Sequence, residues 1–305
     1  METKKYKLTD ETIEVDGKTL YRIEALMDFG DVKKGDKGGF VESEENLSHY
    51  RDCWIYDNAK VYGDAYVFGN ANVCGYARVY GNAQVYDNAK VYGYARVLGT
   101  VWIYGNARVR GDARVRGDAR VYDNAQIFGN SFVGGNACIF GTARVYGDAR
   151  VYGQACVYGN AQIYGETAVY DNAQIYDEAQ VYGGTCMYGN PVICNDAEIT
   201  CDEDYMVFKN WWSSGRYFTW TRSNNMWSVG CFNGTGEELI KKAYKDSYKS
   251  GREYERVVKY VEDILKDEEK NRDNKEKLTQ FVKDVIVEEN LVDDVLKRYR
   301  DEDNK

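Results

Sequence analysis

Residues 103–121 read IYGNARVRGDARVRGDARV, and an aliphatic residue returns in them at every sixth position: Ile103, Val109, Val115 and Val121. The first three are each followed by Tyr or Arg, then by Gly with Asn or Asp, and then by Ala. A period of six fits neither the 3.6-residue period of an α-helix nor the 3.5-residue period of a coiled coil, and frequent glycine disfavours helices. The stretch therefore predicts short strands separated by regular corners.

The six-residue spacing continues without insertion from Ile55 to Ile199. Because side chains alternate on a strand, a three-residue strand points its central Val inward and both neighbours outward. Gly followed by Asn or Asp supplies a corner, since these residues tolerate left-handed backbone angles. Three strands and three corners close a triangle after 18 residues. Residues 53–200 therefore predict a mainly β fold, a parallel β-helix of about eight coils.

The unit V-Y-G-N/D-A-x resembles the repeat of the hexapeptide-repeat superfamily, over about half of the chain. Members of that superfamily fold as left-handed parallel β-helices, so the resemblance implies a left-handed coil here. The segment Gly39-Phe-Val-Glu-Ser-Glu-Glu-Asn-Leu-Ser48 and a later Trp-rich segment also look like uncharacterised hexapeptide proteins encoded by phages and prophages. This second resemblance implies a phage-encoded protein in the cytoplasm of its bacterial host.

A β-rich N-terminal cap is expected over residues 1–52. Two alternating runs flank Asp16-Gly17, which predicts a hairpin. Val41 and Leu47 already follow the six-residue spacing, and Ile55 comes eight residues later. We therefore expect an imperfect first coil with a bulge near His49.

An aromatic β cap is expected over residues 201–235, because aromatic residues alternate on either side of Asn224-Asn225. Thr235-Gly-Glu-Glu238 forms a capping box, which predicts amphipathic α-helices in residues 236–305. These helices are expected to pack on the β-helix or to pair with helices of another subunit.

Five arginines within one coil form a predicted collar of outward side chains around all three faces: Arg108, Arg110, Arg114, Arg116 and Arg120. The simpler interpretation is a solvated surface that Asp112 and Asp118 neutralise, since exposed ion pairs contribute only about 0–1 kcal/mol. The functional interpretation is an anion site for a phosphate-bearing ligand or an acidic partner.

Charge is also distributed unevenly along the predicted β-helix. Five cations occupy equivalent positions on one face, with Phe132 interrupting the series: Lys60, Arg78, Arg96, Arg114 and Arg150. No Lys or Arg occurs between Val151 and Phe208, where acidic residues accumulate. The β-helix is therefore expected to be electrically polar along its axis.

Aromatic residues form two candidate surfaces for a partner or for self-association as a dimer or trimer. The first is a row at 18-residue spacing on one face: Phe68, Tyr86, Tyr104, Tyr122, Phe140, Tyr158 and Tyr176. The second is the set of tryptophans in the C-terminal β cap: Trp211, Trp212, Trp220 and Trp227. The structural alternatives are that the row is an exposed ladder of strand residues and that the tryptophans plug the end of the β-helix.

Catalysis is not expected. The resemblance implies acyl transfer with a histidine base, but the coils contain no histidine, and His49 falls in the predicted cap. No metal site or cofactor is expected either. Eight scattered cysteines without a CxxC pair indicate reduced packing residues, with Cys138 and Cys156 stacked on neighbouring coils.

The net charge of −9 argues against non-specific binding of the whole chain to nucleic acid or membranes. No run of 18 apolar residues and no signal-peptide core occurs, so a cytoplasmic protein is expected. The favoured function is a non-catalytic binding or scaffold protein that self-associates and captures a host protein or a small phosphorylated, nucleotide-like ligand. It would act as a counter-defence inhibitor or sponge. An acyltransferase with an atypical base and a purely structural phage component are the alternatives.

Overall fold

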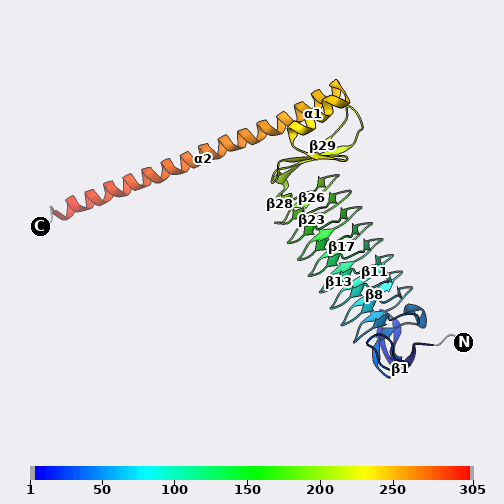
Figure 1. The fold of residues 1–305 in the computed structure, drawn as a ribbon. Coiled ribbons are helices and arrows are strands. Elements are labelled where there is room, and N and C mark those ends of the chain that lie inside the picture. The colour runs from blue at the N-terminus through cyan, green and yellow to red at the C-terminus, as the bar shows by residue number, and fades with distance from the viewer. Residues whose placement is uncertain (1–3, 303–305) are drawn as a thin grey trace. The chain divides into compact units, whose positions relative to one another are not determined.

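The computed structural model of the protein describes the backbone of residues 4–302 and the side chains of residues 4–283. The chain divides into two compact units after Thr235. A parallel β-solenoid of about nine coils makes up most of the first unit, and Figure 1 shows its coils stacked along one axis. The predicted mainly β, triangular architecture is confirmed; its left-handed winding stays a prediction.

Three sheets form the sides of the solenoid, and we call them face 1, face 2 and face 3. Face 1 contains β3 (Lys37–Val41), β5 (Lys60–Val61), β8 (Arg78–Gly81), β11 (Arg96–Gly99), β14 (Arg114–Val115), β17 (Phe132–Val133), β20 (Arg150–Val151), β23 (Ala168–Val169) and β26 (Cys186–Met187). Face 2 contains β4 (Trp54–Ile55), β7 (Asn72–Val73), β10 (Lys90–Val91), β13 (Arg108–Val109), β16 (Gln126–Ile127), β19 (Arg144–Val145), β22 (Gln162–Ile163), β25 (Gln180–Val181) and β28 (Glu198–Ile199). Face 3 contains β6 (Tyr66–Val67), β9 (Gln84–Val85), β12 (Trp102–Ile103), β15 (Arg120–Val121), β18 (Cys138–Ile139), β21 (Cys156–Val157), β24 (Gln174–Ile175) and β27 (Val192–Ile193).

The core of the solenoid consists of the inward aliphatic residues and the corner alanines. From Val61 to Ile199 these residues are almost completely buried. Each strand pairs in parallel with the strand 18 residues later, so Val79 lies beside Val97 and Val97 beside Val115. Identical residue types therefore stack from coil to coil, as the spacing predicted. Cys138 lies beside Cys156, and all eight cysteines, which fall within the described residues, are free thiols.

The corners use a left-handed backbone residue, usually glycine with a φ near +70°. Five aspartates occupy this position with φ between 54° and 56°: Asp57, Asp87, Asp123, Asp171 and Asp177. Each carboxylate accepts a hydrogen bond from the backbone N–H 18 residues later, at 2.9 to 3.3 Å. This bond to the next coil offsets the energetic cost of a left-handed backbone, which residues other than glycine adopt unfavourably.

The N-terminal hairpin is confirmed: β1 (Tyr6–Val15) and β2 (Lys18–Ala25) are antiparallel, with Asp16 and Gly17 at positive φ between them. β2 pairs with β3, and β3 pairs in parallel with β5. A parallel bridge joins Leu47 to Val67. The solenoid therefore begins at β3 rather than near residue 53, which gives about nine coils instead of eight. The expected imperfect first coil is therefore confirmed, with its irregular spacing around His49.

The predicted aromatic sheet is antiparallel and contains β29 (Tyr205–Lys209), β30 (Tyr217–Thr221), β31 (Met226–Val229) and β32 (Phe232–Gly234). It lies against the last coil. Thr219 Oγ1 accepts a hydrogen bond from Val192 N at 2.8 Å, and Ser223 Oγ accepts one from Glu198 N at 2.8 Å. The sheet thus occupies backbone donors that an open solenoid end would leave exposed.

The second unit contains α1 (Gly236–Asp246) and α2 (Tyr248–Glu302). α1 packs on α2, where Gly251 leaves room for the ring of Tyr244. The predicted helical segments after Tyr248 form one continuous helix. Its apolar residues Leu278, Phe281 and Val282 are exposed, and the part of the predicted amphipathic region after residue 283 lies outside the described side chains. No helix within residues 4–302 has the length and apolar character needed to cross a membrane.

Candidate ligand-binding site

The five collar arginines surround one coil as predicted, but they lie on three different faces. Arg108 and Arg110 flank Val109 on face 2, and Arg114 and Arg116 flank Val115 on face 1. Arg120 lies on face 3. A small ligand therefore cannot contact all five guanidinium groups at once.

Three collar arginines lie over aromatic rings. The guanidinium carbon of Arg110 is 4.4 Å from the ring centre of Phe128, that of Arg116 is 4.5 Å from Phe132, and that of Arg120 is 5.2 Å from Trp102. Such contacts restrict a guanidinium without using its N–H donors. Among the described residues, no carboxylate forms an ion pair with any of the five arginines. This holds for Asp112 and Asp118 as well. Direct neutralisation of the collar by these two aspartates is therefore not observed.

Four cations form an uninterrupted row on face 1, which we call the basic row: Lys60, Arg78, Arg96 and Arg114. They are consecutive strand partners, so their Cα atoms follow the strand spacing of about 4.8 Å. Burial, followed by the positive charge of Arg78, lowers the pKa of Lys60. Like charges directly opposite each other destabilise a sheet. Within the described chain no carboxylate forms an ion pair with the row.

The aromatic row on face 3 is a continuous stack from Phe68 to Tyr176. Neighbouring ring centres lie 4.7 to 4.9 Å apart, with planes within 7° of parallel. The rings are half-buried because each covers the faces of its neighbours. This burial raises the pKa of Tyr122 to about 12. The row therefore exposes mainly ring edges and less apolar surface than the spacing suggested.

The four tryptophans expected on a partner surface are mostly buried. Trp220 and Trp227 are strand partners, each 1% exposed, and Trp212 is 8% exposed. Trp211 is 70% exposed. Three of the four therefore belong to the interior of the aromatic cap, which corrects their expected role as a contact surface.

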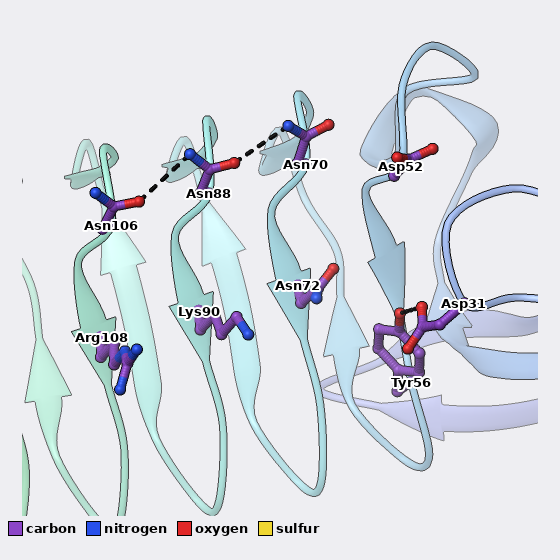
Figure 2. Close-up of a pocket in the computed structure, with 9 residues that line it drawn as sticks. All are labelled: Asp31, Asp52, Tyr56, Asn70, Asn72, Asn88, Lys90, Asn106 and Arg108. Atoms are coloured by element: carbon purple, nitrogen blue, oxygen red, sulfur yellow. Dashed lines mark hydrogen bonds between the residues drawn. The ribbon is translucent and has the colours of Figure 1, made fainter.

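A groove of about 420 Å³ runs along face 2 near its N-terminal end (Figure 2). Its floor comes from the outward residues of β7, β10 and β13, namely Asn72, Lys90 and Arg108. These three are consecutive strand partners, so they repeat at the strand spacing. Arg108 is recognisable from the sequence as an outward arginine, whereas the groove is not.

One edge of the groove is a ladder of corner asparagines. Asn70 Nδ2 donates to Asn88 Oδ1 at 3.1 Å, and Asn88 Nδ2 donates to Asn106 Oδ1 at 3.3 Å. Asn106 continues the chain of bonds to Asn124. The 18-residue spacing of these asparagines is visible in the sequence and was the signal that could have indicated this edge.

The N-terminal end of the groove is acidic. Asp31 and Asp52 line it, and the Tyr56 hydroxyl donates to Asp31 Oδ1 at 2.6 Å. Burial and, to a lesser extent, this hydrogen bond raise the pKa of Tyr56. Asp31 belongs to the loop that follows β2, so only the folded N-terminal cap brings it to this site. The groove therefore has two carboxylates at one end and two cations at the other.

His49, the single histidine of the chain, lies in the N-terminal cap. Its Nδ1 accepts a hydrogen bond from Lys5 N at 3.2 Å, and its ring stacks on Tyr6 at 4.3 Å. Glu44 lies 3.6 Å from its Nε2. These contacts give His49 a packing role in the cap. No group of three or more His, Cys, Asp or Glu side chains in the described part of the chain is arranged to hold a metal ion.

Comparison with protein-family models finds similarity to the YdcK beta solenoid repeat at residues 83–99 and residues 143–159. Both stretches lie inside the solenoid, and each spans about one coil. The match agrees with the β-solenoid fold. A comparison with curated proteins gives no match.

Proposed function

We propose that this protein is a non-catalytic binding protein that captures an acidic protein partner on face 1. The observation that carries the proposal is the basic row, four cations in register without a carboxylate partner among the described residues. Carboxylates of a partner would offset the repulsion between these cations. Arg116 beside Arg114 widens the positive surface at the end of the row.

The shape of this surface favours a protein over a small ligand. The row spans three strand spacings, about 14 Å, along one side of the solenoid. Small molecules bind mainly in concave sites, whereas extended surfaces are typical of protein contacts. The resemblance to phage-encoded proteins suggests a protein of the infected bacterium as the partner, with counter-defence as the purpose.

Two observations favour binding over acyl transfer. The regular coils from residue 53 to residue 200 hold no histidine, and His49 is engaged by Lys5 and Tyr6. A transferase would need another general base within reach of its substrate. The uneven charge of the solenoid favours a specific partner over a purely structural phage component.

Affinity capture from a bacterial lysate tests the proposal. We expect the wild-type protein to retain an acidic protein that Arg96→Glu/Arg114→Glu loses, because charge reversal turns attraction into repulsion. Retention should also fall with added salt. The control is Arg144→Glu, an exposed arginine on face 2, which should retain the same protein. Circular dichroism checks that all variants are folded. The same protein retained equally by the double variant would overturn the proposal.

Self-association belongs to the same proposal, and α2 is its most direct basis. Leu278, Phe281 and Val282 leave an exposed apolar stripe on this helix, and such a stripe is typical of helix pairing. We expect light scattering to give a mass above that of one 34.9 kDa chain for the wild type. Phe281→Ser should shift the mass towards a monomer, and Glu276→Ser, on the opposite side of the helix from the stripe, should not. A monomeric wild type would contradict self-association.

A further inference from the structure

The groove on face 2 has opposite charges at its two ends, and the acidic-partner proposal does not use it. Lys90 and Arg108 are neighbours on consecutive strands, and neither forms an ion pair within the part of the chain that the structure describes. Asp31 and Asp52 lie at the other end (Figure 2). β4 and β13 are three strand spacings apart, so the two ends are separated by about 14 Å. A ligand that fits both ends has an anion at one end and hydrogen-bond donors at the other.

The middle of the groove offers amide groups with unused hydrogen-bonding capacity. An asparagine amide has two N–H donors and two acceptor lone pairs, and the corner ladder uses one donor and one acceptor of Asn88. Asn72 Oδ1 is buried and has no hydrogen-bond partner. A buried acceptor of this kind normally has a donor. Hydroxyl groups both donate and accept, so a polyhydroxylated ligand fits this edge and floor.

We infer that the groove binds a sugar monophosphate. The phosphate lies against Lys90 and Arg108, because forked guanidinium donors and a lysine point charge suit phosphate oxygens. The sugar hydroxyls exchange hydrogen bonds with Asn88 and accept one from Asn72 Nδ2. The hydroxyls at the far end donate to Asp31 and Asp52, which repel a second phosphate. The volume of about 420 Å³ lies within the range of small-molecule sites, roughly 300–1,000 Å³.

Isothermal titration calorimetry with four defined probes tests the ligand class: glucose 6-phosphate, glucose, inorganic phosphate and fructose 1,6-bisphosphate. We expect glucose 6-phosphate to bind at least about tenfold more tightly than each of the others, because it alone satisfies both ends of the groove. Equal affinities for glucose 6-phosphate and inorganic phosphate would mean that the asparagines along the edge contribute nothing to binding, which would overturn the inference. Tighter binding of the bisphosphate, or no binding of any probe, would equally overturn the inference.

Variants locate the site. Lys90→Gln/Arg108→Gln should lower the affinity for glucose 6-phosphate about tenfold or more, through loss of charge-assisted hydrogen bonds. Asn88→Ala should lower it less and should leave the weak binding of inorganic phosphate unchanged. Arg144→Gln is the matched control, because Arg144 occupies the same register position on face 2 two coils further on. An unchanged affinity in the double variant would refute the assignment.

Failure of this inference and failure of the proposed function are distinguishable. The capture experiment reverses charges on face 1, and the calorimetric variants lie on face 2. Loss of the protein partner in Arg96→Glu/Arg114→Glu therefore leaves sugar phosphate binding unchanged if both conclusions hold.

Discussion

Gly153→Ala is expected to destabilise the solenoid by about 2–5 kcal/mol. Gly153 has a φ of +69°, and a left-handed backbone costs a residue with a Cβ atom roughly 1–2 kcal/mol. An added Cβ would also lie 2.7 Å from Asp171 N and 2.8 Å from Asp171 O, both backbone atoms of the next coil. Relief of this overlap requires the coils to shift, which typically costs about 1–3 kcal/mol.

Gly165→Ala separates the two contributions. Gly165 has a nearly identical φ of +71°, but its added Cβ meets only Gly183 N, at an ordinary 3.7 Å. This control should therefore lose about 1–2 kcal/mol, from the backbone angle alone. Urea denaturation of both variants measures the difference. Equal losses would show that the spacing between coils at Gly153 adjusts at no cost, contrary to our expectation.

The regular part of the fold was predictable because each coil repeats the same local solution. Val at every sixth position specifies the inward side, and Gly with Asn or Asp specifies the corner. One coil therefore predicts the next, as the register Val79–Val97–Val115 shows. The first coil was predicted only as an imperfect one, because the extra residues around His49 interrupt the spacing; Leu47 nevertheless pairs with Val67.

The candidate sites were predictable only where they follow the repeat. The positions of the collar and of the aromatic row come directly from the spacing. The groove depends on Asp31, which the loop after β2 brings against Tyr56, and no periodicity relates these two residues. The buried tryptophans were missed for a similar reason. Alternation shows that Trp220 and Trp227 share one side of their sheet, but it does not show which side faces the interior.

Ile139→Ala is expected to cost about 2–5 kcal/mol, since it leaves a cavity in the middle of the solenoid. Ile139 is completely buried and lies between Val121 and Val157 on face 3. Cys138→Ala is the matched control in the same strand, because Cys138 points outward and is only half-buried. A change of about 0.5 kcal/mol is typical of such surface positions.

The cost of Ile139→Ala should remain local, because each coil of a solenoid contacts only its neighbours. Hydrogen exchange should therefore accelerate at the backbone bonds that join β15, β18 and β21, such as Tyr122 N to Ile139 O at 3.0 Å. Exchange in the first and last coils should stay as slow as in the wild type. Acceleration throughout the solenoid would mean that it opens as a single cooperative unit. A loss of stability in Cys138→Ala as large as that in Ile139→Ala would mean that the wrong side chain has been assigned to the core. It would contradict the whole six-residue interpretation.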